Sequence, residues 1–261
     1  MLIDGKKIRE EIKEELKQQF TTIGRVVLAV VWVGNDPVTA KFVAQKKKLA
    51  VAIGVELRLL EFRESISEED LVDEMNKLVN DQGVRGIIVQ LPLPSQINST
   101  KILSLIPSVK DVDALGFEPK VLSPVTQAVA EIIARYHINL LTNNFVILGK
   151  GQLVGRPVAI WLAQEMAKVE VIDKSTKDIK TITQKADVII CGAGEPGILT
   201  PDMIKDGVII IDAGTSESAG KITGDALSAC AEKSALFTPV PGGVGPIALV
   251  CLFKNLWKLS H

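Results

Sequence analysis

The sequence predicts an α/β protein of two domains, and three observations support this fold class. Strand-like and helix-like patterns alternate along almost all of the 261 residues, as in proteins with helices packed on mostly parallel sheets. Irregular sequence interrupts the alternation at 107–125, where we place the domain boundary. A glycine-rich turn joins a strand to a helix at 149–155, which predicts that the second domain is a Rossmann-like, doubly wound parallel sheet.

The first series of elements follows from periodicity and from residues that start or stop an element. An amphipathic helix is expected within 1–20 and a second helix at 37–53. Ser67 with Asp70 three residues later resembles a capping box, which predicts that a third helix begins there. A proline pair closes the third strand, because proline cannot continue a central strand. The expected strands are 25–34, 55–62 and 85–94.

The second series begins with a helix at 126–136 and ends with an apolar helix at 247–259. The glycine-rich turn leads into a further helix within 150–166. The expected strands of this series are 145–149, 168–173, 186–192, 207–214 and 235–240.

The composition argues against several classes of protein. Thirty basic and 31 acidic residues leave a formal net charge of −1, so we expect neither nucleic acid nor a membrane as a partner, and the apolar runs are too short to span a bilayer. Cys191, Cys230 and Cys251 are odd in number and widely spaced, which fits neither a disulfide framework nor a zinc site. With only two histidines, we expect no bound metal. A reduced, cytoplasmic protein is the simplest interpretation.

One lysine of the segment 41–50 points to chemistry. Successive helical residues turn by about 100°, which places Lys46 within the apolar stripe that contains Phe42 and Ile53, whereas the other three lysines lie off the stripe or at its edge. A buried ammonium group must be paired or must lose its proton. Lys46 is therefore a candidate functional residue, and the alternative is a side chain that only reaches past the core to water.

The glycine-rich turn predicts a dinucleotide site. Gly149, Gly151 and Gly155 lie between a strand and a helix, where glycines permit a tight turn and let the backbone approach a pyrophosphate. Their spacing is one residue longer than the usual fingerprint, but Asp173 ends the next strand, where an acid can bind ribose hydroxyls. The alternative is a glycine loop that only packs the helix against the strand.

Five segments carry a resemblance that covers nearly the whole chain: GNDPVTAKFVAQKKK, IIVQLPLP, KDVD, GKGQLVGRP and TPVPGGVGP. In their order and spacing they resemble the bifunctional methylenetetrahydrofolate dehydrogenase/methenyltetrahydrofolate cyclohydrolase family. The resemblance implies a folate cleft between two domains. Residues 1–122, completed by the C-terminal helix 247–261, would form the folate-binding catalytic domain, and residues 123–246 the Rossmann-type NAD(P)-binding domain.

The resemblance also implies the activity. The family oxidises 5,10-methylenetetrahydrofolate to 5,10-methenyltetrahydrofolate and hydrolyses that product to 10-formyltetrahydrofolate. Its catalytic lysine, glutamine partner and pterin-binding aspartate fall on Lys46, Gln90 and Asp113. From the residues alone, Gln90 could equally cap the proline turn and Asp113 could be a turn residue. The implied substrate-binding residues are Phe42, Gln90, Pro92, Asp113, Pro241, Gly242 and Gly243.

The implied cofactor is NADP, with NAD as the alternative. A carboxylate at Asp173 would accept the ribose hydroxyls of NAD and repel the 2′-phosphate of NADP, whereas Lys174 could pair with that phosphate. The family resemblance favours NADP over NAD. The expected cofactor-binding residues are Gly149, Lys150, Gly151, Gln152, Leu153, Val154, Gly155, Arg156, Asp173, Lys174, Ser175 and Thr215.

The sequence departs from the family in four places. Phe42 replaces a tyrosine and removes a hydroxyl near Lys46, the stretch after Asp113 is shorter, Ile247-Ala248 replaces Met-Thr, and Asp173-Lys174 replaces His-Ser. Three functions therefore stay open: the bifunctional enzyme, a dehydrogenase with a weakened cyclohydrolase, and a non-catalytic relative that binds nucleotide or folate. The retained lysine, glutamine and aspartate favour the bifunctional enzyme. The resemblance also implies a homodimer formed through the cofactor domains.

Overall fold

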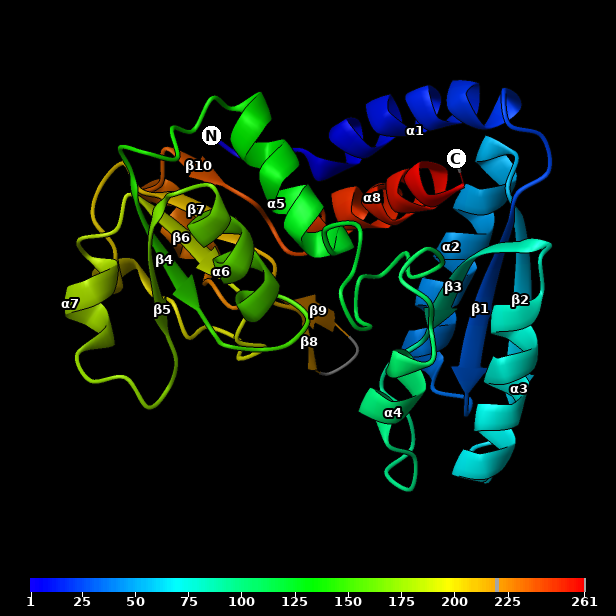
Figure 1. The fold of residues 1–261 in the computed structure, drawn as a ribbon. Helices are drawn as coiled ribbons and strands as arrows, with labels where there is room; N and C mark the ends of the chain where they lie inside the picture. Colours follow the sequence, from blue (N-terminus) through cyan, green and yellow to red (C-terminus); the bar gives the residue numbers. More distant parts are fainter. Residues whose placement is uncertain (219–220, 261) are drawn as a thin grey trace. The chain divides into compact units, whose positions relative to one another are not determined.

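The computed structural model describes residues 1–218 and 221–260 and has the α/β architecture that the sequence predicts (Figure 1). Within these residues it contains two parallel sheets and one small antiparallel hairpin. The chain divides into two compact units. The first-sheet unit comprises Glu10–Pro124 and Leu249–His261, of which residue 261 lies outside the described residues, and the second-sheet unit comprises Met1–Arg9 and Val125–Ala248.

The first sheet is built around β1 (Val27–Val33), which pairs in parallel with β2 (Glu56–Phe62) and β3 (Val84–Val89). Nearly all of β1 is buried, as expected for a central parallel strand that is covered on both faces. Alternate residues of β1 pack against α3 (Glu68–Asn80) and α4 (Ser99–Ser104). The core on that face includes Val27, Ala29, Val31, Val33, Leu71, Met75, Leu78, Ile102 and Leu103.

Helix α2 (Pro37–Ile53) has the bounds that the sequence predicts, because one residue caps its start and another ends it. The Asp36 side chain accepts a backbone N–H of the first turn, and Gly54 ends the helix in the left-handed conformation with φ 81°. The capping prediction is also confirmed, since the Ser67 hydroxyl accepts a hydrogen bond from the Asp70 N–H at 3.0 Å.

The structure differs from the sequence prediction in short elements. Strand β3 ends at Val89 rather than at residue 94, because the proline pair offers no N–H to continue the ladder. The pattern does not predict α4, α7 (Ile179–Thr183), or the hairpin of β8 (Ser216–Ser218) and β9 (Lys221–Thr223). Elements of one or two turns, or of three residues, contain too few repeats to show a period.

The second sheet has the strand order β10-β7-β6-β4-β5, with all neighbours parallel. Its strands are β4 (Asn144–Leu148), β5 (Lys168–Ile172), β6 (Val188–Cys191), β7 (Ile209–Asp212) and β10 (Leu236–Phe237). The strands β5 and β6 lie on opposite sides of β4, so the winding of the chain reverses between β4 and β6. Ligands of open parallel sheets bind at the carboxyl ends of the strands beside such a reversal.

The unit also contains α5 (Pro124–Arg135), α6 (Gly155–Gln164) and the 3₁₀ turns η1 (Pro201–Met203) and η2 (Ser228–Glu232).

Two helices, α1 (Gly5–Thr21) and α8 (Val244–Leu259), contain the division between the units. Residues 1–9 belong to the second-sheet unit, where the Ile3 N–H donates to the Phe237 carbonyl at 2.8 Å. The compact units therefore differ from the predicted domains at the amino terminus. The functional limits, residues 1–122 with 247–261 and residues 123–246, remain a prediction.

Helix α8 fixes the irregular segment that follows α4. The side-chain amide of Asn255 is buried and donates to the Val112 carbonyl at 2.8 Å and to the Leu122 carbonyl at 2.9 Å. These two carbonyls belong to a segment that forms no helix or extended strand. The segment that carries Asp113 therefore takes its shape from a helix far away in the sequence.

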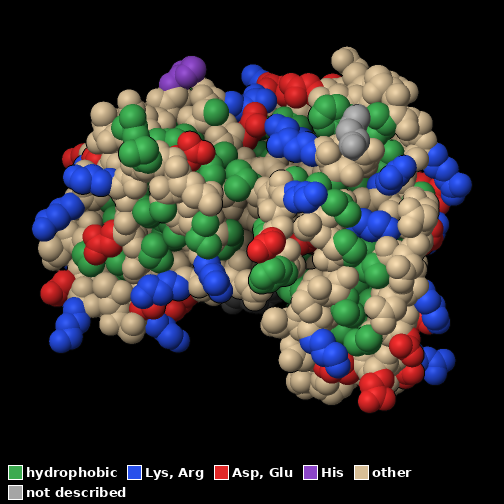
Figure 2. Space-filling view, viewed as in Figure 1, with side chains coloured by type: hydrophobic (Ala, Val, Ile, Leu, Met, Phe, Trp, Pro, Cys, Tyr) green, Lys and Arg blue, Asp and Glu red, His purple; other side chains and the backbone are tan. Residues whose placement is uncertain are grey.

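The distribution of surface charge fits the nearly balanced composition of the chain. Basic and acidic side chains are interspersed on the face shown in Figure 2. The three cysteines are buried, and none of them forms a disulfide within the described residues. In the part of the chain that the structure describes, no helix combines the length and the apolar character needed to cross a membrane.

We expect Gly86→Ala to lower the free energy of unfolding by about 1–3 kcal/mol, the usual cost of overpacking a core. An added Cβ would lie 2.6 Å from Leu256 Cδ1 and 2.7 Å from Val112 Cγ1. Gly245→Ala is the matched control, because a Cβ at that helical position meets nothing within 4 Å and alanine favours a helix. Urea denaturation would measure both variants. Equal stability of Gly86→Ala and the wild type would contradict the tight packing at β3.

Candidate active site and cofactor site

Lys46 is the one lysine of its segment that the fold takes partly out of water. It is half-buried, whereas Lys41, Lys47 and Lys48 are exposed, as the helical geometry predicts. Its Nζ donates a hydrogen bond to Gln90 Oε1 at 2.7 Å. Burial lowers the pKa of Lys46, and the negative charge of Asp113 opposes that shift. The amine therefore gives up its proton more readily than an exposed lysine does.

Gln90 reaches Lys46 because it directly follows the buried strand β3. Its N–H donates to the Val31 carbonyl at 2.8 Å, which continues the pairing with β1 for one residue. Its Nε2 donates to the Leu91 carbonyl at 3.4 Å, a longer contact than the bond from Lys46. The side chain thus orients the amine with a neutral acceptor and also contacts the proline turn.

Asp113 completes the cluster. Burial raises its pKa to about 6, the positive charge of Lys46 lowers it, and Asp111 raises it further. Asp113 therefore exchanges its proton near neutral pH, unlike an ordinary aspartate. The three residues that the family resemblance singles out as catalytic are brought together within the first-sheet unit.

Asp111 supports this segment and was not predicted from the sequence. It is buried, and its Oδ2 accepts a hydrogen bond from the Gly116 N–H at 2.7 Å. The turn between them places Ala114 at φ 55°, a left-handed conformation that a non-glycine residue rarely adopts. A signal was present in the repeated aspartates of KDVD, but the pattern does not say which of them faces inward.

The predicted substrate-binding residues occupy both units. Phe42 lies one turn before Lys46 on α2 and is 40% exposed, and Pro92 is also exposed. Pro241, Gly242 and Gly243 directly precede α8 in the second-sheet unit. Their role in binding substrate remains a prediction.

The glycine-rich turn has the geometry of a dinucleotide cradle. Gly149 has φ 104°, and a Cβ there would lie 2.5 Å from the Gly192 carbonyl oxygen. A Cβ on Gly155 would lie 1.9 Å from the Gly149 carbonyl oxygen. Gly151 is exposed, and the nearest atom to a Cβ there is 3.7 Å away. Two glycines therefore permit close backbone packing and the third leaves open space, which fits the binding of a pyrophosphate.

The remaining predicted cofactor residues lie around this turn or at the ends of neighbouring strands. Asp173 follows β5, and its carboxylate binds Lys150 Nζ at 2.9 Å and accepts from the Ser175 N–H at 2.9 Å and hydroxyl at 2.5 Å. Ser175 and Lys150 hold the pKa of Asp173 well below its usual range. The carboxylate is therefore charged and already paired. The exposed members of the set are Lys150, Gln152, Leu153, Arg156, Lys174, Ser175 and Thr215, and Val154 is partly buried.

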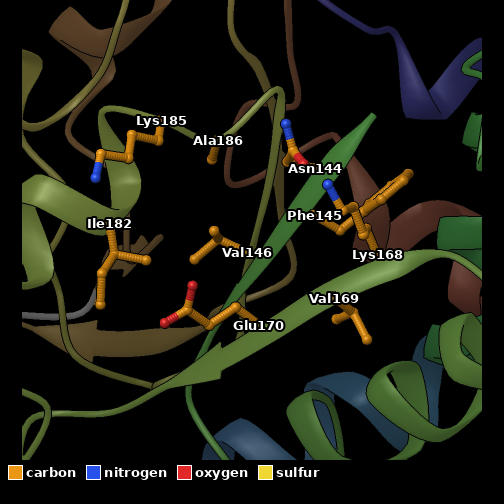
Figure 3. Close-up of a pocket in the computed structure, with 9 residues that line it drawn as sticks. All are labelled: Asn144, Phe145, Val146, Lys168, Val169, Glu170, Ile182, Lys185 and Ala186. Atoms are coloured by element: carbon orange, nitrogen blue, oxygen red, sulfur yellow. The ribbon is translucent and has the colours of Figure 1, made fainter. Parts of the chain in front are cut away.

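A hollow of about 440 Å³ lies elsewhere in the second-sheet unit (Figure 3). It opens at the amino ends of β4 and β5 and just before β6, at the opposite edge from the glycine turn. Its lining residues are Asn144, Phe145, Val146, Lys168, Val169, Glu170, Ile182, Lys185 and Ala186. It contains none of the predicted site residues, so it is not the predicted cofactor site.

Comparisons with known proteins agree on one family. Residues 3–113 match the model for the tetrahydrofolate dehydrogenase/cyclohydrolase catalytic domain, and residues 123–261 match its NAD(P)-binding domain. The bifunctional protein FolD of Clostridium novyi is 38% identical over 269 residues, which cover 97% of each chain. The crystal structure of the bifunctional FolD enzyme from Campylobacter jejuni has a TM-score of 0.96 at 36% identity and covers 100% of this chain and 98% of that chain. The FolD structure from Trypanosoma brucei, complexed with NADP cofactor and inhibitor, has a TM-score of 0.94 at 31% identity and covers 100% of this chain and 97% of that chain.

We expect Asp113→Asn to be more stable than the wild type at neutral pH, by about 1–3 kcal/mol. The pKa of Asp113 is raised from 3.8 to about 6, so the folded state holds this proton more tightly than the unfolded chain does. Keeping the residue charged therefore costs stability above pH 6, and that cost disappears as the pH falls from 6 to about 4. Urea denaturation across this range would measure the difference between variant and wild type.

Asp202→Asn is the control for this experiment. Asp202 is exposed, and Lys180 and Thr200 lower its pKa to about 2, so its replacement brings no gain at neutral pH. Parallel pH curves for Asp113→Asn and the wild type would contradict the raised pKa of Asp113.

Proposed function

The chain belongs to the tetrahydrofolate dehydrogenase/cyclohydrolase family, and on that premise we propose how its residues carry out the two reactions. The protein oxidises 5,10-methylenetetrahydrofolate to 5,10-methenyltetrahydrofolate with NADP and hydrolyses the product to 10-formyltetrahydrofolate. The single observation that carries the residue assignment is the cluster of Lys46, Gln90 and Asp113, with its 2.7 Å hydrogen bond and two shifted pKa values. A dehydrogenase without hydrolysis and a non-catalytic relative are not favoured, because neither needs a desolvated lysine with a dedicated acceptor.

The oxidation depends mainly on positioning. NADP, when bound, supplies the hydride acceptor. The carboxylate of Asp113 accepts hydrogen bonds from the pterin amino group and ring N–H, and the exposed ring of Phe42 stacks on the aromatic part of the folate. Both contacts fix the substrate carbon relative to the first-sheet unit. Pro92, Pro241, Gly242 and Gly243 complete the proposed substrate site.

The hydrolysis needs a base at neutral pH. Lys46 in its neutral form takes a proton from the water molecule that attacks the methenyl carbon, and the new C–O bond forms as the C=N π electrons return to nitrogen. The bond from this carbon to N5 then breaks as the C=O of the formyl group forms, and N5 takes up a proton. Gln90 accepts one N–H of the amine and so aims its lone pair without adding charge. Because this bond is present with phenylalanine at position 42, orientation of the amine does not require the family's tyrosine hydroxyl.

The cofactor site favours NADP through the pairing of Asp173. Lys150 and Ser175 already satisfy its carboxylate, which reduces its repulsion of a 2′-phosphate. Lys174 is the next residue in the chain and is exposed, and we expect it to pair with that phosphate. The exposed Gly151 gives the pyrophosphate room at the amino end of α6. Thr215 follows β7 at the same edge of the sheet and completes the set.

We further propose the finer features that the family resemblance implies. These are a folate-binding domain of residues 1–122 with 247–261, a cofactor domain of residues 123–246, and a cytoplasmic homodimer formed through the cofactor domains. The edge position of β5 supports the dimer, since an edge strand offers unpaired backbone groups to a second copy. Three buried cysteines that form no disulfide within the described residues support a reducing compartment.

The first test is Lys46→Met. We expect methenyltetrahydrofolate hydrolysis to fall by about 100-fold or more, the usual contribution of a positioned base, while the fold survives because methionine replaces the apolar stem of lysine without its amine. Lys48→Met is the matched control on the exposed face of the same helix and should keep its activity. Following absorbance of the methenyl compound in the absence of NADP measures this step alone. Hydrolysis at the wild-type rate in Lys46→Met would remove Lys46 from the mechanism.

The second test is Asp173→Ser, which removes the carboxylate beside the proposed phosphate site. We expect kcat/KM for NADP relative to NAD to rise about threefold, as is usual for a screened surface charge, because Lys150 becomes free and the repulsion is lost. Steady-state oxidation of methylenetetrahydrofolate with each cofactor gives this ratio. Asp202→Ser removes another exposed, lysine-paired carboxylate and should leave the ratio unchanged. The same ratio in Asp173→Ser and the wild type would mean that Asp173 does not face the ribose.

A further inference from the structure

A fully buried carboxylate holds an exposed loop at the carboxyl edge of the second sheet. Asp225 is 0% exposed. Its Oδ2 accepts hydrogen bonds from the Ala193 N–H at 2.6 Å and the Gly194 N–H at 3.1 Å, and its Oδ1 accepts from the Glu195 N–H at 2.8 Å. Residues 193–195 are themselves exposed. A buried charge is costly unless it is hydrogen-bonded, so three converging amide groups explain why this carboxylate is tolerated.

The loop that Asp225 holds lies beside the glycine turn. It follows β6, and the winding of the sheet reverses between β4 and β6. Gly192, the first residue after β6, approaches the turn so closely that a Cβ on Gly149 would lie 2.5 Å from its carbonyl oxygen. A Cβ on Gly192 would in turn lie 2.4 Å from Val154 Cγ1. The turn after β4 and the loop after β6 therefore form adjoining walls of the proposed dinucleotide site.

A second buried carboxylate fixes Asp225 in place. Asp212 at the end of β7 accepts hydrogen bonds from the Gly214 N–H and the Ala226 N–H, both at 2.9 Å. The packing is close, because a Cβ on Gly214 would lie 2.1 Å from Asp225 Cγ and a Cβ on Gly224 would lie 2.2 Å from Asp212 Oδ2. The pair thus connects the loops after β6 and β7 through backbone amide groups, and the second of these loops carries Thr215.

We propose that Asp225 is a positioning residue for the dinucleotide, because its carboxylate holds the backbone of residues 193–195 beside the glycine turn in the conformation that receives the cofactor. The inference rests on the proposed NADP site. It assigns Asp225 no contact with the cofactor or the folate. Its effect is on the binding of NADP, and hydrolysis, which needs no NADP, is independent of it.

Asp225→Asn tests the proposal with the two activities of one protein. Asparagine keeps the shape but replaces one acceptor oxygen with an NH₂ group, so at least one loop amide loses its partner. We expect KM for NADP to rise about tenfold, kcat to change less than KM, and methenyl hydrolysis without NADP to stay at the wild-type rate. Asp202→Asn is the control for the same chemical change at an exposed site of the same unit.

Two outcomes would overturn the proposal. One is an unchanged KM for NADP in Asp225→Asn. The other is a parallel loss of oxidation and hydrolysis in a folded variant, which would indicate a purely structural role. A wild-type protein without NADP-dependent oxidation would instead contradict the proposed function, so the two failures are distinguishable.

Amide hydrogen exchange on the wild-type protein tests the same idea without a variant. If Asp225 sets the loop in advance, the amides of residues 193–195 exchange slowly in the NADP-free protein, and NADP adds little further protection. Rapid exchange in the free protein, slowed only when NADP is added, would mean that the cofactor and not Asp225 orders the loop.

Discussion

An ammonium group that is taken out of water needs an acceptor, and the first-sheet unit is arranged to supply one. Lys46 lies on the buried side of α2, and Gln90, which directly follows β3, accepts a hydrogen bond from its amine. Asp113 adds a charge whose own pKa rises because it is also desolvated. The neutral glutamine and the raised pKa of the aspartate together keep the lysine from being locked as a permanent ion pair. A lysine that can lose its proton is what a hydrolytic step near neutral pH requires.

In the second-sheet unit, buried carboxylates hold loops rather than adjusting the pKa of a lysine. Parallel strands end at one edge, so the loops after β4, β5, β6 and β7 gather there. Glycines let the loop after β4 pack tightly against the loop after β6, and the carboxylates of Asp225 and Asp212 hold the loops after β6 and β7 through backbone amides. In the first-sheet unit the charge of Asp113 opposes the loss of a proton from Lys46, and in the second-sheet unit the carboxylates hold the backbone of loops.

The features that the sequence predicts well are those that leave a local pattern. The bounds of α2 are predictable because a cap, a proline and a glycine lie at its ends, and the burial of Lys46 follows from helical geometry. The roles of Gln90 and Asp113 come only from the family resemblance, since an amide after a strand and an aspartate in a turn have common structural explanations. The roles of Asp111 and Asp225 could not be predicted, because a side chain that binds backbone amides leaves no period and no complementary residue type in the sequence. The short helices α4 and α7 escape prediction because they contain too few turns.

The link from Asn255 to the segment around Asp113 has a consequence for biosynthesis. The amide of Asn255 reaches the Val112 carbonyl across a separation of 143 residues, so the ribosome makes the acceptor long before the donor. At about 5–20 residues per second, the interval is on the order of 10 s. During that time the carbonyls of Val112 and Leu122 lack the side-chain amide of Asn255, and Leu256 of α8 is absent from the space beside Gly86. The nascent first-sheet unit is therefore incomplete until α8 emerges, whereas most of the second-sheet unit is synthesised before that helix.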